Sequence, residues 1–185
     1  MKLLQLFSPV SPERLPDLVL MTDSSISPAG RPVFLPDFAE RWVCAIAPAF
    51  RIGRLGKTIS RRFAHRYVDG VTVAARLIPL DLIDNGYRLS PWANAFDGAV
   101  STGRFLPPDA CREFVVNRPD GSLMRYDFNN WDIYTTIEAI SRYFILKNGD
   151  IIVPYGPIEQ FHVDPGTRIH IESGDRQPIL DFKLK

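Results

Sequence analysis

The side chains best suited to acid–base or metal chemistry are scattered along this chain. Its histidines are His65, His162 and His170, and the acids that remain as metal-ligand candidates are Asp69, Asp81, Asp97 and Glu138. Two ligands on one strand lie two residues apart, and neither set has such a pair. The sequence also contains no glycine-rich phosphate loop and no nucleophile elbow. We therefore expect these histidines to have surface or core roles, and any function to depend on the elements that position isolated polar residues.

The central positioning element is expected to be a pair of strands between residues 41 and 78. From Trp42 to Ile52 the even positions are bulky or apolar, and the odd positions are mostly alanine. This alternation predicts a strand with one thickly packed face and one face of very small side chains. A turn at residues 54–57 and a short helix capped by Ser60 follow. The β-branched run Val71–Ile78 predicts the returning strand.

The rest of the chain predicts a mostly β scaffold. Residues 114–117 and 122–127 flank a Pro-Asp-Gly turn and predict a hairpin. Apolar residues recur at helical spacing from Ile133 to Phe144, with Asp132 as a candidate cap. A first strand is expected to begin within residues 1–10 and to be broken by Ser8–Pro12. Further strands are expected at 151–155, 168–173 and 180–184, and the segment 77–92 is expected to be irregular.

Composition sets the broad class. The chain has 185 residues, a net charge of +1 and 16 prolines, which favour strands joined by shaped loops over a helical bundle. One domain covering residues 1–185 is expected. The small net charge predicts no nucleic-acid partner, and no apolar run predicts a membrane span or signal peptide, so we expect a cytoplasmic protein. Cys44 and Cys111 form no disulfide framework, and Cys44 is expected to be buried.

Three segments resemble the fumarylacetoacetate hydrolase family: RIGRLGKTISRRFAHRYVDG from Arg51, NAFDGAV from Asn94, and ISRYFILKNGDIIVPYGP from Ile140. They are most similar to its single-domain bacterial branch of hydroxyheptadienedioate isomerases and acylpyruvate hydrolases. The resemblance implies an α+β, mostly β fold, a mixed β-sheet roll with short helices. It also implies a homodimer and an enzyme that cleaves or isomerises β-keto carboxylic acids.

The family resemblance also implies a magnesium or manganese site that this sequence does not preserve. Family members carry Glu-x-Glu on one strand and an Asp on the next, three hard oxygen ligands for one cation. The matching positions here are Ala45, Ala47 and Arg76. A methyl group coordinates nothing, and a guanidinium repels a divalent ion. We therefore expect no metal cofactor.

Other positions that the resemblance assigns to the site also differ. The family lysine that would polarise a substrate carbonyl matches Asn94, and a second lysine position holds Met21. The N-terminal segment lacks the family histidine that would activate water. The threonine-containing Thr-Gly-Thr-Pro motif is replaced by Pro154–Pro157. Asp23 persists, either as part of a turn or as a ligand contact.

The resemblance together with these losses predicts a catalytically degenerate member that acts through binding or assembly. We hypothesise an anion-binding pocket centred on Arg76, with Asn94 and Asp23 at its rim, for a small carboxylate or phosphate ligand. A second interpretation stays open, in which Arg76 pairs with an internal acid and fills the space of the lost metal. The alternative function is the family's hydrolase or isomerase activity.

Overall fold

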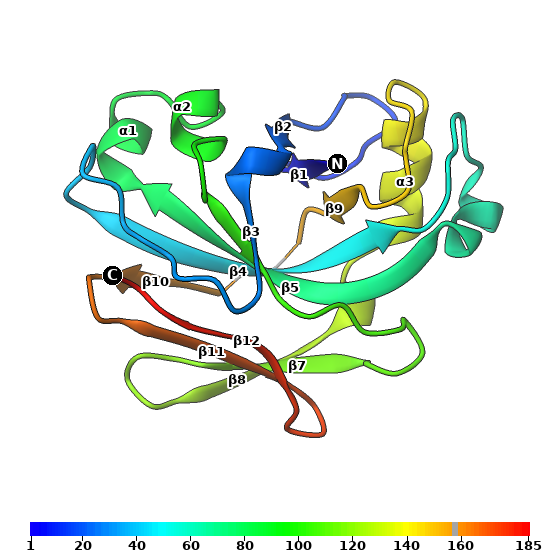
Figure 1. Ribbon diagram of the computed structural model, residues 1–185. Helices are drawn as coiled ribbons and strands as arrows, with labels where there is room; N and C mark the ends of the chain where they lie inside the picture. Colours follow the sequence, from blue (N-terminus) through cyan, green and yellow to red (C-terminus); the bar gives the residue numbers. More distant parts are fainter. Residues whose placement is uncertain (157–158) are drawn as a thin grey trace.

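Two β-sheets form most of the chain in the computed structural model, which describes residues 1–156 and 159–185. Figure 1 shows the larger sheet across the middle, the smaller sheet below it, and the helices above. The strands are β1 Lys2–Leu6, β2 Leu18–Thr22, β3 Ile26–Pro28, β4 Trp42–Ile52, β5 Val68–Pro79, β6 Val100–Thr102, β7 Glu113–Asn117, β8 Leu123–Asp127, β9 Ile151–Val153, β10 Glu159–Val163, β11 Arg168–Ser173 and β12 Pro178–Lys183. The predicted α+β, mostly β fold with a mixed sheet is confirmed.

The helical segments are short and lie at the ends of strands. The α-helices are α1 Leu80–Asp84, α2 Pro91–Asn94 and α3 Ile133–Ser141, and the 3-10 turns are η1 Asp23–Ser25, η2 Arg61–Arg66 and η3 Phe128–Asn130. Asp132 caps α3 as predicted, because its carboxylate accepts a 2.9 Å hydrogen bond from the Thr135 N–H. Among the described residues, no helix combines the length and apolar character needed to cross a membrane.

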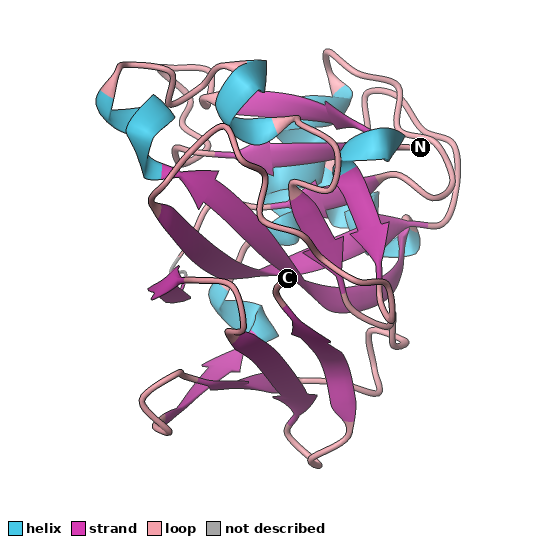
Figure 2. Cartoon of the chain, turned by 60° about the vertical axis from the view of Figure 1, so that its left-hand side comes forward, coloured by secondary structure: helices cyan, strands magenta, loops and turns pink. Residues whose placement is uncertain are grey.

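The eight-stranded sheet is built around β4 and β5, which pair antiparallel over their whole lengths. Its order is β2-β1-β9-β4-β5-β6-β3. Two strands share the other edge of β4: β10 pairs with Trp42–Ile46, and β9 pairs with Phe50 and Arg51. The four-stranded sheet has the order β12-β11-β7-β8, and Figure 2 shows it beneath the larger sheet.

The two faces of β4 have different environments, as the alternating sequence predicts. The even residues, including Trp42, Cys44 and Ile46, belong to a core that also contains Phe114 and Ile171 of the four-stranded sheet. The odd residues face the opposite side, where small alanines pack near β1, β2 and β9. Arg76 of β5 lies opposite Ala45, so its side chain is on this same alanine face.

Two local predictions were wrong. Ser60 precedes η2, but its side chain makes no capping hydrogen bond, and the segment is a 3-10 turn rather than an α-helix. The segment 77–92, expected to be irregular, contains the end of β5, all of α1 and the start of α2. Helices of four or five residues are too short to show a clear helical period in a sequence.

Candidate functional site

Arg76 lies on β5 directly opposite Ala45 of β4, on the alanine face. The residue is 6% exposed, and its buried Nε has no hydrogen-bond partner among residues 1–156 and 159–185. The guanidinium lies 5.0 Å from the ring centroid of Phe7. In residues 1–156 and 159–185 no ion pair joins Arg76 to a carboxylate. Arg76 is therefore a buried cation whose polar partners in the described chain are neutral.

The side chain that holds Arg76 is Asn94, at the end of α2. Its Oδ1 accepts a 3.0 Å hydrogen bond from Arg76 Nη1, and its Nδ2 donates to the carbonyls of Arg88 and Ser90 at 2.8 and 2.9 Å. Ser90 caps α2 by accepting from the Trp92 N–H, which fixes this short helix against the chain that precedes it. Asn94 thus orients Arg76 from one side.

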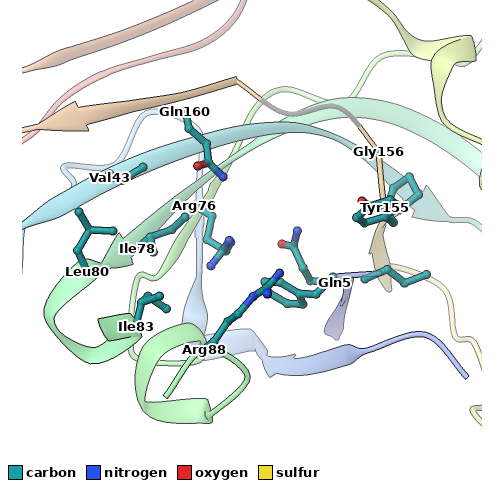
Figure 3. A pocket seen from close by; sticks show the side chains of 13 residues that line it. Gln5, Val43, Arg76, Ile78, Leu80, Ile83, Arg88, Tyr155, Gly156 and Gln160 are labelled. Carbon is teal, nitrogen blue, oxygen red and sulfur yellow. The ribbon is translucent and has the colours of Figure 1, made fainter. Parts of the chain in front are cut away.

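A cavity of about 280 Å³ opens beside Arg76. Figure 3 shows Arg76 and Arg88 pointing toward the same space, with Gln5 next to them and Gln160 across it. The described residues that line the cavity are Gln5, Leu6, Phe7, Val43, Arg76, Ile78, Leu80, Ile83, Arg88, Pro154, Tyr155, Gly156 and Gln160. No carboxylate is among them, so the lining carries positive charge from two arginines.

Burial lowers the pKa of Arg76 to about 10, because a charged group loses solvation when water is removed. The nearby Cys44 acts in the opposite direction, and the positive charge of Arg88 lowers the Arg76 pKa further. The guanidinium still carries its full charge near pH 7. Burial also raises the pKa of the Cys44 thiol to about 12, so this cysteine stays protonated.

The structure brings together two of the three residues expected at the anion pocket. Arg76 lines the cavity, and Asn94 accepts a hydrogen bond from Arg76 but is completely buried and not among the described lining residues. Asp23 is exposed in η1, between β2 and β3, and is not among the residues that line the cavity. The second interpretation, in which Arg76 pairs with an internal acid, is not what the described residues show: its partner is the neutral Asn94.

The positions matched to the family's metal ligands do not provide metal donors. Ala45 and Ala47 are buried methyl groups, and Arg76 is a cation. Within the described ranges, no group of three or more histidine, cysteine, aspartate or glutamate residues is arranged to hold a metal ion. The other carboxylates considered in the sequence lie elsewhere: Asp69 pairs with Arg51, Asp81 pairs with Arg41, Asp97 is exposed, and Glu138 accepts from the Arg61 N–H. Magnesium and manganese prefer oxygen ligands, and the side chains of Ala45, Ala47 and Arg76 offer no donor atom to a cation, so these residues do not fit either ion.

Three polar residues of the cavity were not predicted from the sequence: Gln5, Arg88 and Gln160. Gln5 gave one signal, a polar residue inside the apolar run of β1. Gln160 lies across from Ala45 because β10 pairs with β4, a register that no local pattern specifies. The segment Pro154–Pro157, expected to replace a family pocket motif, does reach the cavity through its first three residues. Its last residue, Pro157, lies outside the described part of the chain.

Comparison with known proteins connects this geometry to a family. The chain matches the family model "Fumarylacetoacetate (FAA) hydrolase C-terminal" over residues 3–175. It is 27% identical over 171 residues to the mitochondrial oxaloacetate tautomerase fahd-1 of Caenorhabditis elegans, covering 87% of this chain and 80% of that protein.

Solved structures have the same fold. Fumarylpyruvate hydrolase from Pseudomonas aeruginosa, determined in complex with Mn²⁺ and pyruvate, has a TM-score of 0.79 and 20% identity, with 99% of this chain and 88% of that chain covered. A 2-hydroxyhepta-2,4-diene-1,7-dioate isomerase from Mycobacterium marinum has a TM-score of 0.81 and 19% identity, with 99% and 73% covered. From the family match over most of its length, the chain belongs to the fumarylacetoacetate hydrolase family.

Proposed function

We propose that this protein is a catalytically degenerate member of its family that binds a small carboxylate or phosphate anion at Arg76 without a metal ion. The family and the fold are those of hydrolases and isomerases. The proposal departs from them because the positions matched to the metal ligands are Ala45, Ala47 and Arg76. Three carboxylates with one divalent ion would carry a charge of about −1, whereas the present residues carry about +1.

The observation that carries the proposal is that no carboxylate of the described residues forms an ion pair with Arg76. A guanidinium buried without a carboxylate is costly, since desolvation is not repaid by an ion pair. Its planar donors suit a carboxylate or phosphate, and the Nε, which no described residue contacts by a hydrogen bond, provides one donor. The cavity beside it is large enough for a small organic acid and has no acidic lining residue among those described. An anion in this space would supply the missing partner.

Thermal unfolding of the pure protein with pyruvate, malonate or inorganic phosphate tests this proposal. A ligand at ten times its Kd should raise the Tm by about 3 °C, because binding only the native state stabilises it by mass action. Arg76→Met should abolish the rise, and Arg31→Met, which removes an exposed arginine, should not. No rise with any of these anions would overturn the proposal.

The second candidate is a metal-dependent hydrolase or isomerase that acts on β-keto acids of the acylpyruvate type. It is favoured by the similarity to a hydrolase solved with Mn²⁺ and pyruvate and to a protein named an oxaloacetate tautomerase. Millimolar Mg²⁺ or Mn²⁺ would then raise the Tm, and turnover of acylpyruvates or oxaloacetate would depend on the ion. Such a result would show that the ligand assignment at Ala45, Ala47 and Arg76 is wrong.

An assembly role is compatible with either candidate. Exposed apolar side chains of Phe38, Tyr87 and Trp92 surround a surface depression near α1 and α2. A homodimer, a complex with an active paralogue and a cytoplasmic location stay predictions. Sedimentation of the pure protein distinguishes a dimer from a monomer, and a protein that is unstable alone would favour the paralogue.

A further inference from the structure

Arg88 is the second positively charged residue in the lining of the cavity, and the proposed anion binding at Arg76 does not require it. It lies between α1 and α2, is exposed, and reaches the cavity from the side opposite β4. Figure 3 shows its side chain extended toward Gln5 and the end of Arg76. No ion pair involves Arg88 in the described part of the chain.

The backbone at Arg88 is tied to the buried arginine. Asn94 accepts from Arg76 Nη1 at 3.0 Å and donates to the Arg88 carbonyl at 2.8 Å. One amide therefore sets the position of both arginines relative to each other. Because an asparagine has one acceptor and one donor group, only this orientation of the amide satisfies both contacts.

Two like charges facing one cavity repel each other, and Arg88 is close enough to lower the pKa of Arg76. A monoanion at Arg76 would neutralise one of them and leave the other. A doubly charged anion would neutralise both arginines, and the described lining residues include no carboxylate that would repel it. The cavity of about 280 Å³ limits such a ligand to a compact one.

We propose that Arg88 determines the charge specificity of the Arg76 pocket, so that it selects a compact dianion over a monoanion of the same size. One negative group binds at the free edge of Arg76, and the second binds the Arg88 guanidinium at the mouth. The inference rests on the proposed anion-binding function and adds a specificity-determining residue to it. The recognised chemistry is the double charge, which a short dicarboxylate or a phosphate can supply.

Isothermal titration at constant ionic strength and pH 8 tests this with malonate and monomethyl malonate, a matched pair that differs by one charge. The wild type should bind malonate at least tenfold more tightly. Arg88→Gln should reduce this preference to about twofold and leave the affinity for the monoester nearly unchanged. Arg31→Gln removes an exposed arginine elsewhere and should keep the full preference. Inorganic phosphate, titrated in parallel, shows whether the second charge must belong to a carboxylate.

The outcomes separate the two proposals. Equal affinity of the wild type for both malonates, or an unchanged preference in Arg88→Gln, would overturn the role of Arg88 and leave anion binding at Arg76 intact. No binding of any of the anions would overturn both. Because Arg88 is exposed and its structural contact is made by the backbone carbonyl, the glutamine variant is expected to fold.

Discussion

Two arginines lie on opposite sides of the β4–β10 pair, and only one of them, Arg118, forms an ion pair with a carboxylate among the described residues. Arg118, which follows β7, donates to both oxygens of Glu159 at 3.0 and 2.9 Å, and Tyr126 donates to the same carboxylate. Arg76, on the other side, has a neutral amide as its side-chain partner. The first arginine joins the two sheets, whereas the second faces a cavity.

The difference arises from two consecutive residues of β10. Glu159 lies opposite Ile46 and Gln160 lies opposite Ala45, so their side chains point to opposite faces of the sheet. The carboxylate therefore faces the smaller sheet, and the amide faces the cavity. Hydrogen bonding to Glu159 raises the pKa of Arg118, while burial lowers that of Arg76. The same residue type is thus part of the scaffold on one face and a candidate receptor for an anion on the other.

Removing the carboxylate of the Arg118–Glu159 pair should have the largest effect on stability. Glu159 is 7% exposed, and Glu159→Gln replaces charge-assisted hydrogen bonds from Arg118 and Tyr126 by weaker neutral ones. We expect the free energy of unfolding to fall by about 2–3 kcal/mol, measured by urea denaturation. Glu40→Gln, at an exposed glutamate, should change it by less than about 0.5 kcal/mol. Equally small effects in both variants would show that the Arg118–Glu159 pair does not stabilise the fold.

Low pH should also weaken the Arg118–Glu159 pair, with a smaller loss of stability than the Glu159→Gln substitution causes. Burial acts to raise the pKa of Glu159, but hydrogen bonds from Arg118 and Tyr126 outweigh it and hold the pKa below the ordinary value of 4.5. The unfolded chain therefore takes up this proton first as the pH falls. The stabilisation is fully present above pH 4.5 and is lost as the pH falls through the lowered pKa. Urea unfolding between pH 3 and 7 should show a shallower acid loss in Glu159→Gln than in the wild type, and parallel curves would contradict this origin.

A carboxylate introduced on the cavity side should give Arg76 an ion-pair partner, as Glu159 does for Arg118. Gln160→Glu places a carboxylate across Ala45 from Arg76, where it would pair with the guanidinium and compete with a bound anion. We expect malonate affinity to fall at least tenfold, about 1.4 kcal/mol, in isothermal titration. Gln160→Met keeps the length of the side chain without the charge and should bind malonate within about threefold of the wild type. Undiminished binding in the glutamate variant would show that the ligand lies elsewhere.

The smallest effect, on the free energy of unfolding, is expected from removing the charge of Arg76. In the folded protein the pKa of Arg76 is lowered from 12.5 to about 10, so its charged form is destabilised by folding at neutral pH. Arg76→Met fills a similar volume without charge and should raise the free energy of unfolding of the ligand-free protein by about 1 kcal/mol. Arg118→Met should lower it, since Glu159 would lose its partner. A loss of stability in both variants would mean that Arg76 is as much a structural residue as Arg118.

Much of the scaffold could be predicted from local sequence. The alternation from Trp42 to Ile52 fixed both ends of β4, and Asp132 capped α3 as expected. The Pro-Asp-Gly turn joins β7 and β8 in the predicted hairpin. These features depend on neighbours a few residues away, whose spacing sets which face is apolar and which backbone group needs a cap. The family resemblance itself was carried by such local segments and was confirmed by the family match.

The site depended on contacts that no local pattern records. The sequence identified Arg76 and the alanines beside it, through the resemblance, but it placed Asn94 and Asp23 at a rim where the structure does not have them. Arg88 and Gln160 come from separate segments and reach one cavity only because α2 packs against β5 and β10 pairs with one end of β4. The sequence by itself determined most of the strands, among them β4 with its two faces, but not β3, β6 or β10. It also placed Ala45, Ala47 and Arg76 at the positions that the resemblance matches to metal ligands. The tertiary structure alone decided which arginine received an acid, because that choice depends on the register of β10 against β4, and a shift of one residue would exchange Glu159 with Gln160.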